Sequence, residues 1–370
     1  MIPVCEPLLT GKELEYVADC LKTNWISSVG KYIAEFENKF ANYCECKHGI
    51  STTSGTTALH LALASLGIGH GDEVIVPAFT MAASVFAVVY TGATPVLVDS
   101  DPETWNMDIA RIEAKVTNKT KAIMPVHIYG HPCDMDPIMK IAGRYNLFVV
   151  EDAAEAHGAE YKGRKVGGIG HIACFSFYAN KIITTGEGGM VVTNDDRIAE
   201  KARRLKDQAF SPGKRFLHTD IGFNYRMTNI QAAIGLAQLE NIDKFIDLRR
   251  QNASHYNAAL TDISGITLPP EKEWAKNVYW MYSILVGQSF GTGRNELMQR
   301  LRERGVDTRT FFIPMHLQPA FMNMHLFNGE SYAIAEELSE RGLYLPSGSG
   351  LKKEELDYIC NSIKEIAALS

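Results

Sequence analysis

One lysine of this 370-residue chain lies where a lysine is chemically unusual. Lys181 follows an alternating aromatic segment, residues 175–178, and precedes a glycine-rich turn, residues 186–189, that leads into apolar residues. We expect a buried, hairpin-like segment there, and burial favours the neutral form of a lysine amine. A neutral amine is a nucleophile that forms Schiff bases with carbonyl compounds. The alternative, more common for a lysine taken alone, is a surface side chain that packs its stem on the aromatic residues.

Two further sites could serve the same chemistry. Asp152 follows an apolar segment, residues 147–150, and it could cap a following helix or hold a proton on a heteroaromatic nitrogen in a dry site. Residues 51–57 are rich in serine and threonine and open an apolar helix. The free N–H groups and positive end of such a helix suit a phosphate group, although plain N-capping by a hydroxyl side chain explains the same residues.

The elements that must position these groups alternate along the chain. Apolar strands separated by helices predict a mostly parallel sheet with helices on both faces, and ligands of such sheets bind beyond the carboxyl ends of the strands. The expected strands are residues 73–76, 95–98, 121–126 and 147–150, and the helices among and around them are residues 11–23, 81–90, 137–145 and 197–208.

A second unit is expected towards the end of the chain. After residue 261 the pattern changes to shorter elements, including a strand near residues 279–286 and helices at residues 294–304 and 354–368. We therefore expect a large domain over residues 1–240 and a smaller α+β domain over residues 241–370. One long helix, residues 229–252, should bridge the two.

Composition and motif spacing exclude several classes of function. The net charge is −6, without the basic face that nucleic-acid binding needs. We expect no signal peptide and no membrane span. The seven cysteines are scattered along the chain, and free thiols in a reducing cytoplasm are the simplest explanation. Cys44 and Cys46 have no second pair that would complete a zinc site, so we expect no metal. Neither a dinucleotide-binding glycine motif nor a P-loop occurs.

Taken together, the motifs resemble those of the pyridoxal-phosphate-dependent sugar aminotransferases of the DegT/DnrJ/EryC1/StrS family. The resemblance covers nearly the whole chain and rests on many ordered motifs. These are residues 25–28 (Trp-Ile-Ser-Ser), 54–56 (Ser-Gly-Thr), 77–80 (Pro-Ala-Phe-Thr), 126–130 (Val-His-Ile-Tyr-Gly), 151–158 (Glu-Asp-Ala-Ala-Glu-Ala-His-Gly), 175–177 (Phe-Ser-Phe) with Asn180 and Lys181, 186–190 (Gly-Glu-Gly-Gly-Met), 224–228 (Asn-Tyr-Arg-Met-Thr) and 314–316 (Pro-Met-His).

The resemblance implies a fold, a cofactor and a set of residues. The fold would be α/β of the aspartate-aminotransferase type (fold type I), in a homodimer with active sites at the subunit interface. The cofactor would be pyridoxal 5'-phosphate, with Lys181 as its Schiff-base lysine and proton carrier and Asp152 paired with the pyridine nitrogen. The other cofactor-binding residues would be Gly55, Thr56, Met81, Ala154, Glu155, Ser176 and, from the partner subunit, Asn224. Those near the substrate would be Trp25, Arg226 and His316.

Two positions depart from the family pattern. Glu155 stands where many relatives have glutamine beside the ring hydroxyl, so a carboxylate there would have to share a proton. Met81 stands where many relatives stack an aromatic residue on the ring, and a thioether makes a smaller contact.

The activity that the resemblance implies is transfer of the amino group of L-glutamate to C4 of a nucleotide-linked 4-keto-6-deoxyhexose, with GDP-linked 4-keto-6-deoxymannose as the expected acceptor. UDP- or dTDP-linked sugars and amination at C3 remain open. A sugar dehydratase of the same fold would have histidine in place of Lys181, and a non-catalytic regulatory relative would not need Lys181, Asp152, Ser176 and Asn224 together. A generic amino-acid enzyme is a further alternative, with Arg309 as the carboxylate-binding residue.

Overall fold

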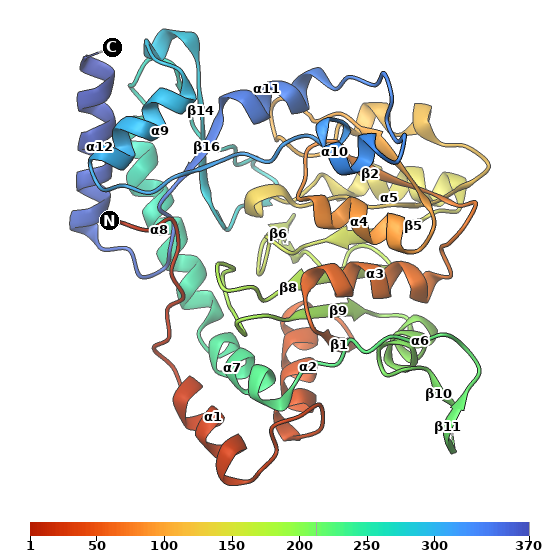
Figure 1. The fold of residues 1–370 in the computed structure, drawn as a ribbon. Helices are drawn as coiled ribbons and strands as arrows, with labels where there is room; N and C mark the ends of the chain where they lie inside the picture. Colours follow the sequence, from red (N-terminus) through yellow and green to blue (C-terminus); the bar gives the residue numbers. More distant parts are fainter. Residues whose placement is uncertain (212, 370) are drawn as a thin grey trace.

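A seven-stranded sheet forms the centre of the larger part of the molecule (Figure 1). The structure is a computed structural model that describes residues 1–211 and 213–369. Six strands are parallel, and only β9 runs antiparallel to its two neighbours, β1 and β8. The strands lie in the order β1 (His48–Thr52), β9 (Gly189–Thr193), β8 (Ile172–Ser176), β5 (Phe148–Asp152), β4 (Thr120–Ile123), β2 (Glu73–Pro77) and β3 (Thr94–Val98). The expected mostly parallel sheet is confirmed.

Helices cover both faces of this sheet because successive side chains of a strand point to opposite faces. Phe175 lies in β8 and Phe177 directly follows it, and both rings pack against Phe40 of α2 (Lys31–Tyr43). Ser176, between them, faces the start of α3 (Gly55–Leu66) on the other side. The remaining helices of this part are α1 (Glu13–Lys22), α4 (Ala82–Tyr90), α5 (Met135–Tyr145), α6 (Asp196–Lys206) and α7 (Asn229–Leu239).

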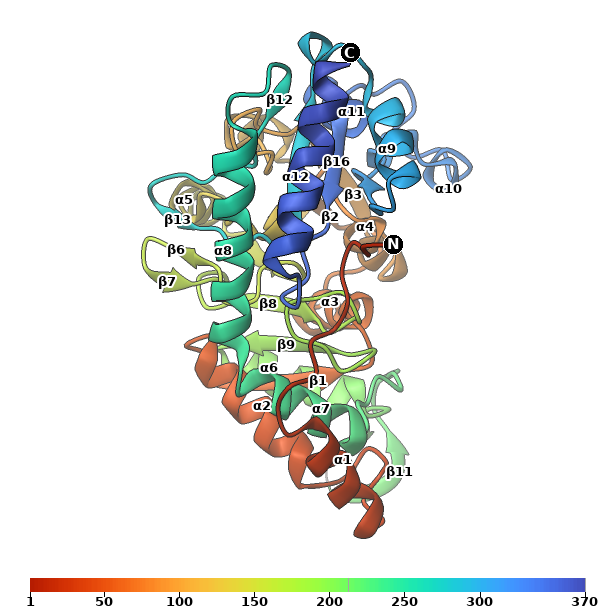
Figure 2. The same cartoon turned by 90° about the vertical axis from the view of Figure 1, so that its left-hand side faces the viewer.

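A smaller antiparallel sheet organises the C-terminal part, in the order β12 (Ile266–Thr267), β14 (Tyr282–Val286), β16 (Gly342–Leu345) and β15 (Arg309–Thr310). Its own apolar cluster joins β14 and β16 to helices that lie side by side in Figure 2. The helices are α8 (Ile242–Leu260), α9 (Arg294–Glu303) and α12 (Lys353–Ala368), with α10 (Pro319–Met322) and α11 (Ala333–Arg341) nearer the large sheet.

Two small sheets complete the described strands: β13 (Ala275–Lys276) with β6 (Glu160–Tyr161) and β7 (Arg164–Lys165), and the hairpin β10 (Phe210–Ser211) with β11 (Lys214–His218). The N-terminal segment pairs Ile2 with Val306 before it reaches α1. It therefore ties the two parts of the chain together.

The prediction of one long helix over residues 229–252 is wrong. The chain forms two helices, because α7 ends at Leu239 and α8 begins at Ile242. Asn241 has φ −118° and ψ 8°, and its side-chain amide donates to the carbonyl of Ala237. An asparagine side chain that bonds the backbone competes with the helical hydrogen bonds, and here it ends the helix. The proposed division at residue 240 coincides with this break but stays a prediction.

Candidate active site

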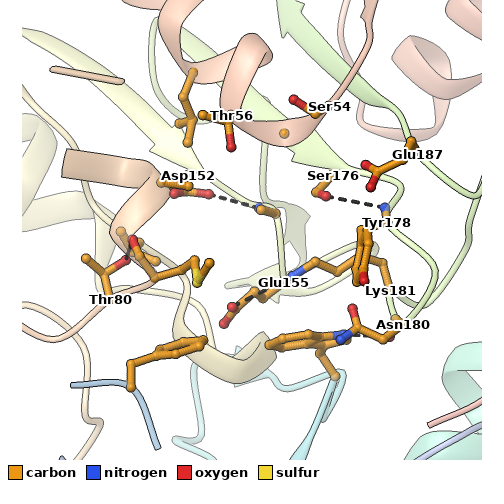
Figure 3. A pocket seen from close by; sticks show the side chains of 18 of the residues that line it. Ser54, Thr56, Thr80, Asp152, Glu155, Ser176, Tyr178, Asn180, Lys181 and Glu187 are labelled. Carbon is orange, nitrogen blue, oxygen red and sulfur yellow. Dashed lines mark hydrogen bonds and ion pairs between the residues drawn. The ribbon is translucent and has the colours of Figure 1, made fainter. Parts of the chain in front are cut away.

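A cavity of about 390 Å³ opens beside the carboxyl ends of β5 and β8 (Figure 3). This is the edge at which parallel sheets bind ligands. The predicted residues that line it are Gly55, Thr56, Met81, Asp152, Ala154, Glu155, Ser176 and Lys181. Residues far along the chain, Trp280, Phe312 and Tyr344, close it from the C-terminal part.

Lys181 lies in the loop of the β8–β9 hairpin, where its main-chain N–H donates to the carbonyl of Tyr178. Its side chain is only 10% exposed, so it is not the surface lysine of the alternative interpretation. The amine Nζ is 3.8 Å from Glu155 Oε1 and 3.6 Å from the ring centroid of Trp280. Burial lowers the pKa of Lys181, against the attraction of Glu155 and Asp152. The amine is therefore closer to its nucleophilic form at neutral pH than an exposed lysine.

Asp152 ends strand β5 and points into the same cavity (Figure 3). Its Oδ2 accepts a hydrogen bond of 2.7 Å from the hydroxyl of Ser84, and its Oδ1 accepts one of 3.2 Å from the N–H of Ala154. The chain after Asp152 forms turns, so the carboxylate does not cap a helix. Burial raises its pKa, and the Ser84 hydroxyl opposes that rise. A cationic partner in the cavity would favour the carboxylate form.

A buried charge network supports Asp152 from behind. Glu151 accepts hydrogen bonds from His127 Nε2 and from the N–H groups of residues 167, 169 and 170. Burial alone would raise the pKa of Glu151, but His127 and these N–H groups hold it below its ordinary value. The main-chain N–H of His127 also donates to the carbonyl of Asp152. The backbone at the end of β5 is thereby fixed on both sides.

The start of α3 forms one end of the cavity. The hydroxyl of Ser54 accepts the N–H of Thr57, whose own hydroxyl accepts the N–H of Ser54. This capping box leaves the N–H groups of the first helical residues, Gly55 and Thr56, for a ligand, and the helix dipole favours an anion there. A Cβ at Gly55 would lie 2.7 Å from Cβ of Ser176, so only glycine lets the helix approach β8 this closely. Plain capping and anion binding therefore coexist at this helix start.

Glu155 is the second buried carboxyl group of the cavity. Its Oε2 accepts a 2.8 Å hydrogen bond from the N–H of Tyr129, while Oε1 faces Lys181. Burial raises the pKa of Glu155 to about 7, with the Lys181 charge opposing the rise. A group with such a pKa can give and take protons near neutral pH.

Four predicted residues do not line this cavity. Arg226 forms an ion pair with Asp207 and donates to Asn224 Oδ1, so these residues bind one another at the surface. Trp25 is 54% exposed and lies beside a separate cavity with Asn229. His316 is buried, and its Nε2 contacts Glu336 at 2.9 Å. The roles of Asn224, Trp25, Arg226 and His316 stay predictions.

Several lining or supporting residues were not expected from the sequence. Ser84 follows Thr80 by four residues, and only that spacing could have suggested that their hydroxyls meet. Trp280, Phe312 and Tyr344 belong to the other part of the chain, and no local pattern links them to Lys181. Tyr178, Asn180 and Glu187 line the cavity from the hairpin that carries Lys181, so their nearness in sequence was a usable signal.

The described residues contain no candidate metal site. Within residues 1–211 and 213–369, no group of three or more histidine, cysteine, aspartate or glutamate side chains could hold an ion. In the same part of the chain, none of the helices combines the length and apolar character needed to cross a bilayer.

The cavity fits pyridoxal phosphate on three counts. It holds a buried amine for the aldehyde, a buried carboxyl group for the ring nitrogen and a glycine-opened helix start for the phosphate. Lys181, Asp152, and Gly55 with Thr56 and Ser176 would hold these parts of the cofactor.

Known proteins share both the sequence and the fold. Residues 7–364 match the model of the DegT/DnrJ/EryC1/StrS aminotransferase family. GDP-perosamine synthase of Caulobacter vibrioides is 49% identical over 99% of this chain and 98% of its own length, and GDP-perosamine synthase of Escherichia coli O157:H7 is 50% identical over 98% of each. An aminotransferase from Psychrobacter cryohalolentis has a similar structure, with a TM-score of 0.93, 36% identity and 98% of each chain covered.

The chain belongs to the DegT/DnrJ/EryC1/StrS aminotransferase family. The family resemblance and the fold class expected from the motifs are confirmed.

Proposed function

We propose that this aminotransferase moves the amino group of L-glutamate to C4 of GDP-linked 4-keto-6-deoxy-D-mannose and so forms GDP-perosamine. The single observation that carries the proposal is the 49–50% identity to two GDP-perosamine synthases over nearly the full length of each.

We propose that Lys181 carries protons during the reaction. When bound, pyridoxal phosphate supplies an aldehyde for condensation with amines and a ring that absorbs electrons. The buried Lys181 amine would bind that aldehyde and, once free, accept a proton from one reacting carbon and return it to another. Glu155, 3.8 Å away, can share the proton because its raised pKa lies near neutrality.

Asp152 would keep a proton on the ring nitrogen. Its carboxylate can accept that proton's hydrogen bond while Ser84 and Ala154 fix its two oxygens. A carboxylate in this dry place favours a nearby positive charge, so Asp152 would favour the cationic form of the ring, which is the form that absorbs electrons best. The N–H groups of Gly55 and Thr56, with the hydroxyl of Ser176, would bind the phosphate.

The decisive experiment offers the purified protein L-glutamate and a panel of 4-keto sugars linked to GDP, UDP and dTDP. We expect amination of the GDP-linked sugar at C4, identified by mass and by NMR, with 2-oxoglutarate formed in equal amount. Reaction with only UDP- or dTDP-linked sugars, or an amine at C3, would refute the substrate proposal. Lys181→Ala should form no product and lack the absorbance of cofactor bound through a lysine; full turnover by this variant would refute the role of Lys181.

A homodimer is part of the proposal. Asn224 and Arg226 lie at the surface and do not line the cavity of their own chain, and exposed apolar side chains, Phe216 and Ile221, lie close to them in sequence. A second subunit could therefore receive Asn224 at its cavity. We further propose that the enzyme works in the cytoplasm, without nucleic-acid or membrane partners, and that its product serves the O-antigen of lipopolysaccharide.

Mixing two inactive variants tests the shared site. Lys181→Ala and Asn224→Ala impair different halves of the proposed interface site, so a mixed dimer would contain one intact site. Random reassociation should restore about a quarter of the wild-type activity, because half of the dimers are mixed and each has one working site of two. If mixing restores nothing although mixed dimers form, Asn224 does not reach the partner's cavity.

A further inference from the structure

The amine of Lys181 rests on the face of an indole ring. Its Nζ lies 3.6 Å from the ring centroid of Trp280, a side chain that is 3% exposed. The two residues come from different parts of the fold: Lys181 from the β8–β9 loop and Trp280 from the segment just before β14. Lys181 and Trp280 line the same cavity, so the contact joins the two parts of the fold.

The indole is held rigidly in this place. Its Nε1 donates a 2.8 Å hydrogen bond to the carbonyl of Asn180, the residue before Lys181. The main-chain carbonyl of Trp280 accepts a 2.6 Å hydrogen bond from the buried guanidinium of Arg249 in α8, which also donates to the carbonyl of Ser347. The N-terminal segment adds Cys5, whose thiol donates to the same carbonyl of Asn180. Ring and lysine backbone are therefore joined into one unit.

The position of the ring bears on where the amine can go. The π-face of an indole attracts an ammonium group and at the same time excludes water from it. The amine also faces Glu155 Oε1 at 3.8 Å. Burial lowers the pKa of Lys181, while Glu155, Asp152 and Cys5 raise it. The ring and the carboxyl group together hold the amine without a covalent bond.

We propose that Trp280 is a positioning residue that holds the Lys181 amine in place whenever this amine is not bonded to the cofactor. The inference rests on the proposed function, because only an amine that is released and recaptured in each cycle needs such a place. The ring limits the swing of a long side chain and keeps its proton-carrying atom beside Glu155. Trp280 contributes by position and not by exchanging protons itself.

Two substitutions separate the ring face from the ring N–H. Trp280→Phe keeps an aromatic face and loses the hydrogen bond to Asn180, whereas Trp280→Leu loses both and still fills much of the space against water. In the cofactor-free protein we expect Trp280→Leu to lower the pKa of Lys181 by about 0.5 to 1 unit, since the ammonium loses the ring. Trp280→Phe should retain most of the wild-type pKa.

The measurement is the pH dependence of Lys181 modification by an amine-reactive reagent, followed by mass spectrometry of the Lys181 peptide. In the loaded enzyme, kcat should fall about ten- to a hundredfold in Trp280→Leu while KM for glutamate changes little, because misplacement of a reacting group costs rate. The matched control is Trp274→Leu. Trp274 packs against Tyr161 and His131 outside the cavity, so this variant should leave both readouts unchanged.

A wild-type pKa of Lys181 in a folded Trp280→Leu protein would overturn the proposal. If this variant does not fold, tryptophan fluorescence of the wild-type protein decides: we expect a pH transition at the pKa of Lys181 that Lys181→Met abolishes. An identical titration in Lys181→Met would overturn the proposal equally. These readouts use neither cofactor nor sugar, so a failure of the sugar assay and a failure of this inference are told apart.

Discussion

Removing the hydroxyl of Ser84 should weaken cofactor binding through Asp152. Ser84 is fully buried, donates 2.7 Å to Asp152 Oδ2 and shares a 2.9 Å hydrogen bond with Thr80. A second hydrogen bond to the carboxyl group, from the N–H of Ala154, is longer at 3.2 Å. The Ser84→Ala variant therefore deprives Asp152 of its shorter hydrogen bond with little change in shape.

The size of the effect follows from the charge on the acceptor. A hydrogen bond to a charged group contributes about 1.5–3 kcal/mol, which corresponds to about one to two pKa units. Burial already raises the pKa of Asp152, and the variant should raise it further by about that amount. The bound ring would favour the carboxylate form of Asp152, which the Ser84 hydroxyl stabilises, so losing this hydrogen bond should increase the Kd for pyridoxal phosphate about ten- to a hundredfold.

The same shift should change how stability depends on pH. A carboxyl group with a raised pKa binds its proton more tightly in the folded than in the unfolded chain. Its contribution to stability is therefore full below the unfolded pKa and is lost as the pH rises through the folded pKa. In Ser84→Ala the loss should extend to a higher pH, as chemical denaturation at a series of pH values would show.

The assay is an equilibrium titration of cofactor-free protein with pyridoxal phosphate from mildly acidic to mildly alkaline pH. Ser65→Ala is the matched control, because Ser65 is also buried in a helix but its hydroxyl donates to the carbonyl of Leu61. Equal affinities of the two variants at every pH would refute the argument that Ser84 controls the charge of Asp152.

Two further variants test other parts of the cavity. Gly55→Ala should lower cofactor affinity at least about tenfold, because its Cβ would meet Ser176. Its control is Gly143→Ala, which has open space around it in helix α5 and should add about 0.5–1 kcal/mol of stability while leaving binding intact. Cofactor titration and thermal unfolding measure the two effects, and equal binding by the two variants would contradict the close approach of α3 to β8. Glu155→Gln removes a charge that raises the pKa of Lys181, so the acid limb of the pH–rate profile should move about one unit to lower pH. An unmoved limb would mean that Glu155 and Lys181 titrate independently.

The local patterns of the sequence identify the large sheet and the centre of the site. Apolar strands that alternate with helices predict the parallel sheet, and an aromatic strand followed by Lys181 and a glycine-rich turn predicts the β8–β9 hairpin. The position of Asp152 at the end of a strand followed from the same reasoning. These features depend on neighbours in the chain, and side-chain periodicity reports them directly.

Tertiary structure decided the surroundings that give these groups their chemistry. Nothing near Lys181 in the sequence indicates that Trp280 covers its amine, and nothing near Asp152 indicates that Ser84 bonds its carboxylate. The end of α7 at Leu239 likewise depends on a side chain that bonds the backbone, and hydrophobic periodicity does not register such a bond. Periodicity records which face of an element is buried, but the pKa of a buried group depends on which distant side chains meet it there, and only the folded chain brings those together.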